Sequence, residues 1–83
     1  MRIGHRPPLL LDLRGLRCPH LAGRVRKALS RAQAGEFLEF TCTDPLAAID
    51  IPHLIAQLGD EITAQHRTPD LIRFVVRKGN ARP

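Results

Sequence analysis

Four short stretches of the chain have the apolar pattern of β-strands. The second alternates between apolar and polar residues, the fourth places three apolar residues on one face, and the first is a brief apolar run that Arg14-Gly15 closes. Such stretches, when bounded by Gly, Pro or Asp, are typical of strands that bury one face. The sequence therefore predicts strands at residues 9–13, 36–42, 61–67 and 71–77. In the last strand, Ile72, Phe74 and Val76 form the most apolar face of the chain.

Two stretches between these strands have apolar residues at helical spacing. The first runs from Pro19 to about Gln33, and we expect Gly35 to end it as the residue after the C-cap. Its apolar face consists of Leu21, Val25, Ala28, Leu29 and Ala32, and its other face is cationic. A right-handed parallel crossover between the first two strands follows from this order.

The second helical stretch contains two Asp-to-Pro steps, Asp44-Pro45 and Asp50-Ile51-Pro52. Because proline disrupts a helix interior and aspartate favours helix starts, we expect Asp44 and Asp50 to act as caps. The pattern predicts a helical turn and then a short second helix, broken from it near Pro52. The whole order is βαβαββ, an α+β fold in which two helices pack on one face of a four-stranded sheet.

Length and composition fit a single folded unit. The chain has 83 residues, 43% of them hydrophobic, and only two cysteines, with no metal-binding CxxC spacing. We therefore expect no metal site, and a reducing, cytoplasmic location. No apolar run is long enough to span a membrane. Residues 1–8 are interpreted as a flexible N-terminal tail and residues 80–83 as a frayed C-terminus.

The chain carries a formal charge of +5 at pH 7. This surplus favours an acidic partner, either a protein face or a nucleic-acid backbone. A nucleic-acid-binding module that uses the cationic helix and the Arg73/Arg77 face is therefore one hypothesis. The small number of aromatic residues, three Phe with no Trp or Tyr, counts against a base-stacking platform.

Candidate chemistry lies at Cys18, which directly precedes Pro19. Proline suits the first position of a helix, so Cys18 is expected to be its N-cap, beside the positive end of the helix dipole. That placement, with Arg14, Arg17 and Arg24 nearby in the sequence, favours the thiolate. The alternative is that Cys18 is a small apolar residue that fills the strand-to-helix corner.

Three sequence blocks, LDLRGLRCPHL, DPLAAIDIP and RFVVRKG, resemble the TusA/SirA-like sulfur-carrier family from Leu11 to Gly79. The resemblance implies a two-layer sandwich with strand order 1-2-4-3, strand 4 antiparallel to the others, and a TusA-like domain at residues 9–79. It also implies that Cys18 accepts a persulfide sulfur from a cysteine desulfurase or rhodanese-like donor. An acceptor protein, in a route such as tRNA thiolation, then takes this sulfur without a cofactor.

The family signature is CPxP, whereas this chain has Leu21 in place of the second proline. Leu21 lies on the apolar helix face, so we expect the fold to survive and partner choice to change. A regulatory interaction domain without sulfur transfer is therefore a further alternative. Several other residues are candidates: Pro19, Arg17 and His20 to support the thiolate, Arg24, Lys27, Asp44 and Asp50 as a partner surface, and Cys42 as a buried residue or a resolving thiol.

Overall fold

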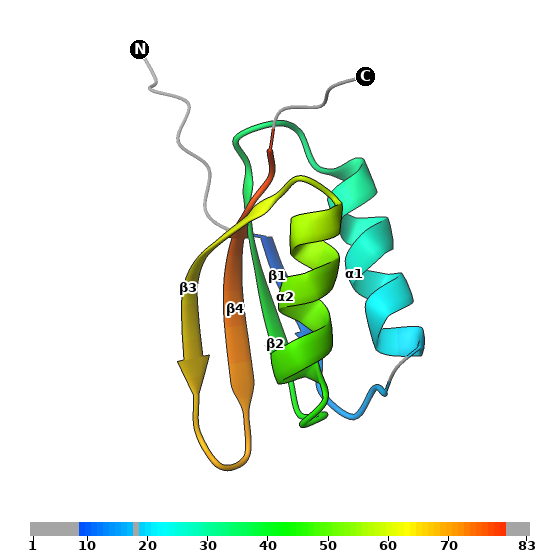
Figure 1. Ribbon diagram of the computed structural model, residues 1–83, viewed down its shortest axis with the longest axis vertical. Helices are drawn as coiled ribbons and strands as arrows, with labels where there is room; N and C mark the ends of the chain where they lie inside the picture. Colours follow the sequence, from blue (N-terminus) through cyan, green and yellow to red (C-terminus); the bar gives the residue numbers. More distant parts are fainter. Residues whose placement is uncertain (1–8, 18, 80–83) are drawn as a thin grey trace.

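The computed structural model describes residues 9–17 and 19–79. Its elements are β1 (Leu9–Leu13), α1 (His20–Arg31), β2 (Phe37–Cys42), α2 (Ala47–Gln57), β3 (Glu61–Arg67) and β4 (Ile72–Arg77) (Figure 1). This order and all four strands confirm the prediction to within one residue at each strand end. The predicted tails, 1–8 and 80–83, and Cys18 lie outside the described residues.

The four strands form one mixed sheet in the order β1-β2-β4-β3, as expected. β1 is parallel to β2, and β4 is antiparallel to both of its neighbours. Both helices cover the same face of this sheet (Figure 1). β2 and β4 therefore occupy the centre, where strands bury most surface, and β1 and β3 are the edges.

The core lies between the sheet and the two helices. Strand residues on the helix-facing side alternate with exposed ones, and Leu38, Phe40, Cys42, Phe74 and Val76 are at most 1% exposed. α1 contributes a stripe at helical spacing, Leu21, Val25 and Leu29. The expected burial of Leu21 and Cys42 is thus confirmed. Neither helix of the described residues is long and apolar enough to cross a membrane.

The predicted break near Pro52 is wrong, because α2 is continuous through this residue. Pro52 lies in the second turn, where its missing amide leaves the carbonyl of Ala48 without a helical donor, at a cost of about 3 kcal/mol. Residues on both sides of Pro52 are buried on one face of the helix: Ala47, Ile51, Leu54 and Ile55. Burial of each of the large side chains contributes about 1.5–3 kcal/mol, so packing against the sheet outweighs the proline.

The two aspartates expected as helix caps have other positions. Asp44 comes before the N-cap residue Leu46, and its Oδ1 accepts the Leu46 amide at 3.0 Å, which closes the turn that leads into α2. Asp50 starts no helix and lies within the first turn of α2. Its carboxylate is still favourable there, because the helix dipole is positive at this end.

The end of α1 also differs from the prediction. The helix ends at Arg31, and its C-cap residue, Ala32, has extended dihedrals. Gly35 therefore does not follow the C-cap. It has φ +87° in a turn closed by the Glu36 amide and the Gln33 carbonyl, and its own amide donates to the carbonyl of Lys78 at 2.9 Å.

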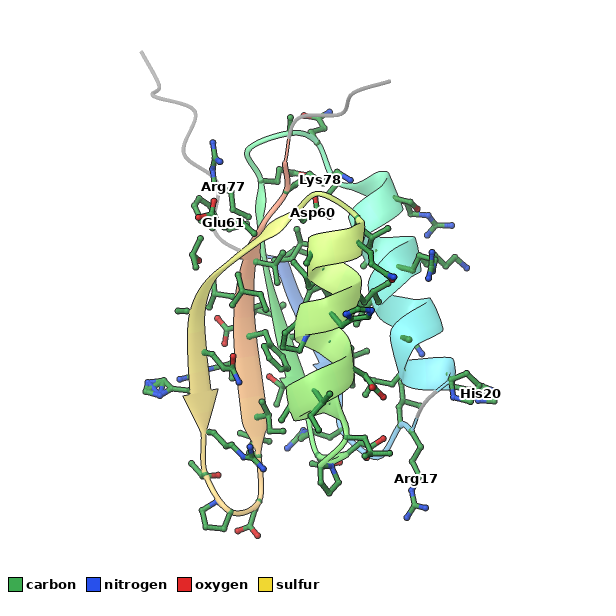
Figure 2. All side chains as sticks on the ribbon, in the orientation of Figure 1. Arg17, His20, Asp60, Glu61, Arg77 and Lys78 are labelled. Carbon is green, nitrogen blue, oxygen red and sulfur yellow. The ribbon has the colours of Figure 1, made fainter. Side chains whose placement is uncertain are left out.

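Lys78, near the end of the closing block RFVVRKG, lies with Asp60 at the end of the molecule opposite to Arg17 and His20 (Figure 2). The Gly79 amide donates to Asp60 Oδ1 at 2.8 Å, and Lys78 Nζ lies 3.8 Å from the same oxygen. The Asp60 side chain is only 2% exposed. Gly79 also approaches the Gly59 carbonyl too closely for any Cβ at this position. These contacts attach the end of β4 to the start of β3.

Candidate functional site

Two loops meet at the carboxyl ends of the parallel strands β1 and β2. One loop leads from β1 to α1 and the other from β2 to α2, so both helices begin at this end of the sheet (Figure 1). A groove of ≈ 590 Å³ lies between them. Its lining residues are Gly15, Leu16, Arg17, Thr43, Asp44, Pro45 and Leu46. We call it the loop groove; Cys18 directly follows one of its lining residues in the sequence.

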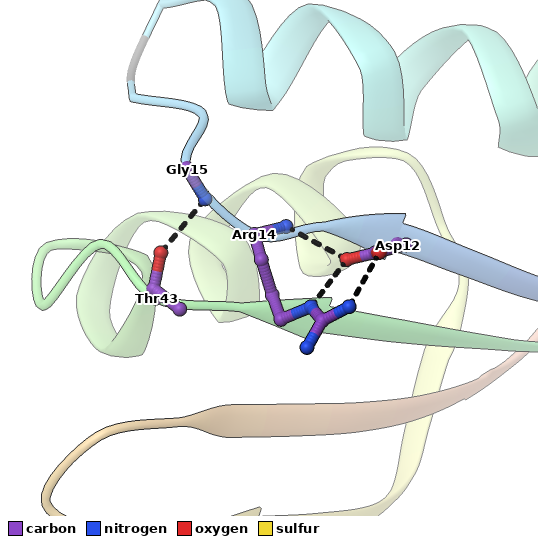
Figure 3. Close-up of polar contacts among 4 residues, drawn as sticks. All are labelled: Asp12, Arg14, Gly15 and Thr43. Atoms are coloured by element: carbon purple, nitrogen blue, oxygen red, sulfur yellow. Dashed lines mark hydrogen bonds and ion pairs between the residues drawn. The ribbon is translucent and has the colours of Figure 1, made fainter.

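A hydrogen bond joins the two loops (Figure 3). The Gly15 amide donates to Thr43 Oγ1 at 2.9 Å. Gly15 has φ +85°, and the Leu16 amide donates to the Leu13 carbonyl at 3.2 Å, which is the pattern of a type II turn. This turn needs a positive φ at its third residue, so glycine is required there to direct the chain from β1 towards the start of α1.

The start of α1 lies one residue later than predicted. Pro19 is the N-cap residue, not the first helical residue, and the helix begins at His20. The ψ of Pro19 is −6°, far from the helical value of about −42°. Its carbonyl nevertheless accepts the Gly23 amide at 3.0 Å. The prediction that Cys18 is the N-cap concerns a residue outside the described part of the chain, and Pro19 occupies that position.

The positive end of α1 carries no acidic residue in its first turn. The pyrrolidine ring of Pro19 provides no side-chain cap. Helix N-termini attract anions through their amide groups and dipole. An anion beside this end of α1, such as a thiolate, would therefore be stabilised.

Arg14 does not add a net positive charge at this end of the sheet, in contrast to the prediction. Its Nε lies 2.8 Å from Asp12 Oδ1 and its Nη2 lies 2.9 Å from Oδ2, and the Arg14 amide also donates to Oδ1 (Figure 3). These hydrogen bonds from Arg14 lower the pKa of Asp12 from 3.8 to about 2. The two charges therefore compensate each other locally.

The other basic residues near Cys18 in the sequence point outward. Arg17 lines the loop groove, and Figure 2 shows its side chain extending away from the sheet. His20 is also exposed and points to another side of the molecule. Any role of either residue beside the thiol stays a prediction.

The structure brings together only part of the predicted partner surface. Arg17 and Asp44 line the loop groove from different loops, whereas Asp50 is exposed on α2 outside it. Arg24 and Lys27 line a separate groove along α1. Cys42 is fully buried at the end of β2, which agrees with its interpretation as a buried residue.

Sequence reasoning missed the residues that complete the loop groove. Thr43 was identifiable, because it directly follows β2 at the edge where parallel strands end together. Leu46 and Ile49 are 56% and 70% exposed, and no local pattern separated them from core residues. They place an apolar patch beside the groove, three residues apart at the start of α2.

The face of the sheet opposite to α1 and α2 bears on the nucleic-acid hypothesis. Arg73 Nε lies 3.5 Å from Glu39 Oε2 on this face. Arg77 is paired in register with Glu61 on β3. Acidic residues therefore lie among the cations of this face, which reduces its attraction for a phosphate backbone.

Fold and site together define a small α+β protein with a groove where two helices begin. A family model described as Sulfurtransferase TusA matches residues 10–78. A protein of Archaeoglobus fulgidus named "Putative sulfur carrier protein" is 40% identical over 68 residues, which cover 81% of this chain and 88% of that protein. The chain therefore belongs to the TusA sulfurtransferase family.

Proposed function

We propose that the protein is a sulfur carrier that holds a persulfide sulfur on Cys18. The Cys18 thiolate attacks the terminal sulfur of a donor persulfide, the donor S–S bond breaks, and the donor cysteine leaves as a thiolate. Cys18 then bears the group S–SH, and an acceptor thiolate takes the terminal sulfur in the same manner. Each transfer exchanges one S–S bond for another, so it needs no cofactor and no net oxidation.

The observation that carries this proposal is the start of α1. Cys18 directly precedes the N-cap residue of a helix whose first turn holds no acid, and this helix begins beside a groove. Amide groups and the helix dipole favour thiolate over thiol there. Membership of the TusA family supports the same role.

The loop groove is the proposed docking place for the proteins that give and take the sulfur, which are a cysteine desulfurase or rhodanese-like donor and an acceptor protein. Arg17 and Asp44 offer charges of both signs, and Leu46 and Ile49 offer exposed apolar surface next to them. Such a mixture of apolar and charged surface is typical of transient protein interfaces. Free thiols persist in a reducing compartment, so we propose the cytoplasm as the site of this activity.

Sulfur loading tests the proposal directly. Incubation with a cysteine desulfurase and cysteine should add the mass of one sulfur atom, which a reducing agent removes. The adduct should be absent in Cys18→Ser and present in the matched control Cys42→Ser, whose thiol is buried. Loading that persists in Cys18→Ser would refute the assignment.

Leu21→Pro separates the carrier from the regulatory alternative. The Leu21 amide donates to the Arg17 carbonyl at 2.9 Å, so proline removes this bond close to the groove. If the chain is a carrier as it stands, wild type and Leu21→Pro should both load and differ only in rate. Loading by Leu21→Pro alone, with desulfurase and rhodanese donors alike, would show that this chain has lost sulfur transfer.

A further inference from the structure

A second groove lies along α1, away from the loop groove. It has a volume of ≈ 490 Å³, and we call it the α1–β1 groove. Leu11 of β1 and Ala28 of α1 are half-buried and provide apolar surface, whereas Arg24, Lys27 and Arg31 are exposed. The groove therefore combines an apolar base with three positive charges in a row on one helix.

β1 is an edge of the sheet, and among the described strands its only partner is β2. Alternate backbone amides and carbonyls of an edge strand point away from the sheet and can pair with an added strand. Leu9 and Leu10 are 58% and 70% exposed on this strand. β1 contains no proline that would prevent an added strand from pairing with it. Its one charged residue is Asp12, which is paired with Arg14.

The positive charges of the groove have no acidic partner within the described part of the chain. None of Arg24, Lys27 and Arg31 takes part in an ion pair there. The remaining segments, residues 1–8 and 80–83, contain arginine but no aspartate or glutamate. These three cations are therefore available to an acidic partner.

The spacing of the three cations fits an extended chain. Along a helix, Lys27 and Arg31 are separated by about 6 Å and Arg24 and Lys27 by about 4.5 Å. Alternate residues on one face of a strand are about 6.6 Å apart. We propose that the α1–β1 groove binds an extended acidic segment of another protein, which pairs with β1 and directs acidic side chains at alternate positions towards Arg24, Lys27 and Arg31.

A peptide explains this surface better than a nucleic acid. Strand addition uses the backbone groups of β1, which a phosphate backbone cannot pair with in a ladder. Among the described residues, no aromatic side chain lines the groove, so bases find no stacking partner there. The inference does not depend on sulfur transfer, since neither Cys18 nor the loop groove takes part.

The test uses the full chain and a fluorescent peptide of about ten residues, in which glutamate and valine alternate. Lys27→Glu should weaken binding about tenfold, because it removes one exposed ion pair and introduces a repulsion. The matched control is Arg26→Glu, which makes the same charge change on the same helix outside the groove. It should weaken binding by less than about twofold, because solvent and salt screen the more distant charge.

A second peptide, in which proline replaces each valine, keeps the charge, lacks every second backbone amide and cannot form a regular strand pairing with β1. It should bind about tenfold more weakly, and only the original peptide should shift the amide resonances of β1 in NMR spectra. Equal losses for Lys27→Glu and Arg26→Glu, equal binding of both peptides, or no binding at about 1 mM peptide would each overturn the proposal. Tighter binding of a single-stranded oligonucleotide, with the same dependence on Lys27, would assign the groove to nucleic acid instead.

Discussion

Gly15→Ala tests whether the turn before α1 depends on backbone conformation alone. Gly15 has φ +85°, and a Cβ built on it meets no atom within 4 Å. The substitution therefore introduces no steric conflict with the rest of the protein, and its only cost in the folded state is the left-handed conformation of alanine. Gly23 is the matched control, because a Cβ on it also meets no atom within 4 Å, but it lies inside α1.

The two substitutions should change stability in opposite directions. An L-residue with left-handed dihedrals costs about 1–2 kcal/mol, and the smaller freedom of alanine in the unfolded chain returns about 0.4–1 kcal/mol. Gly15→Ala should thus lower the free energy of unfolding by about 1 kcal/mol. Gly23→Ala should raise it by about 0.8–1 kcal/mol, because alanine is the better helix former. The two variants should differ by about 2 kcal/mol.

Urea unfolding followed by circular dichroism measures both effects. If the slope of each transition is unchanged, the shift of the midpoint reports the change in stability. In thermal unfolding, the expected 1 kcal/mol corresponds to about 4–8 °C for a domain of this size. Sulfur loading of the two variants shows whether the turn also positions the thiol, in which case only Gly15→Ala should load more slowly.

Equal stabilisation by both substitutions would refute the reasoning, since it would mean that residue 15 does not need a positive φ in solution. A loss for Gly15→Ala well above about 2 kcal/mol would also contradict it. Such a loss would show a steric conflict where the structure has open space.

Three further predictions concern other parts of the chain. The pKa of Asp12 is lowered to about 2, so its pairing with Arg14 stabilises the protein above the ordinary pKa of 3.8, and this stabilisation is lost as pH falls towards 2. The difference in urea midpoint between wild type and Asp12→Asn should shrink over that range, and a constant difference would contradict the pairing. Gly79→Ala should destabilise the protein by about 1–3 kcal/mol in urea unfolding, because its Cβ conflicts with the Gly59 carbonyl, and it should leave sulfur loading of the folded protein unchanged. In the folded protein, iodoacetamide should modify Cys18 and not Cys42, which is 0% exposed. If iodoacetamide also modifies the Cys18→Ser variant, the thiol of Cys42 is accessible and the prediction is wrong.

Local sequence patterns were sufficient for most of the fold. Short apolar or alternating stretches identified all four strands to within one residue at each end, because a strand that buries one face must place apolar side chains towards that face. The strand order followed from the resemblance rather than from periodicity. The ends of α1 were less well predicted, since Pro19 is the N-cap residue rather than the first helical residue, and the C-cap is Ala32.

The continuity of α2 could not be predicted from the sequence. Pro52 is locally unfavourable in a helix, and only the burial of Ile51, Leu54 and Ile55 against the sheet outweighs its effect. The candidate site likewise combines a feature that the sequence shows with one that only the tertiary structure shows. Cys18 before Pro19 marked the start of α1 in the sequence, but the turn at Gly15 and its bond to Thr43 depend on two loops meeting in space.

The sequence by itself determined the order of the elements and most of the strand residues that face the core, because both depend on local periodicity. Only the tertiary structure decided which charges remain available to a partner. Arg14 is compensated by Asp12, whereas Arg24, Lys27 and Arg31 line a groove beside an edge strand without an ion pair in the described residues. Electrostatic pairing depends on distances between side chains, and those distances are fixed only when the helices pack on the sheet.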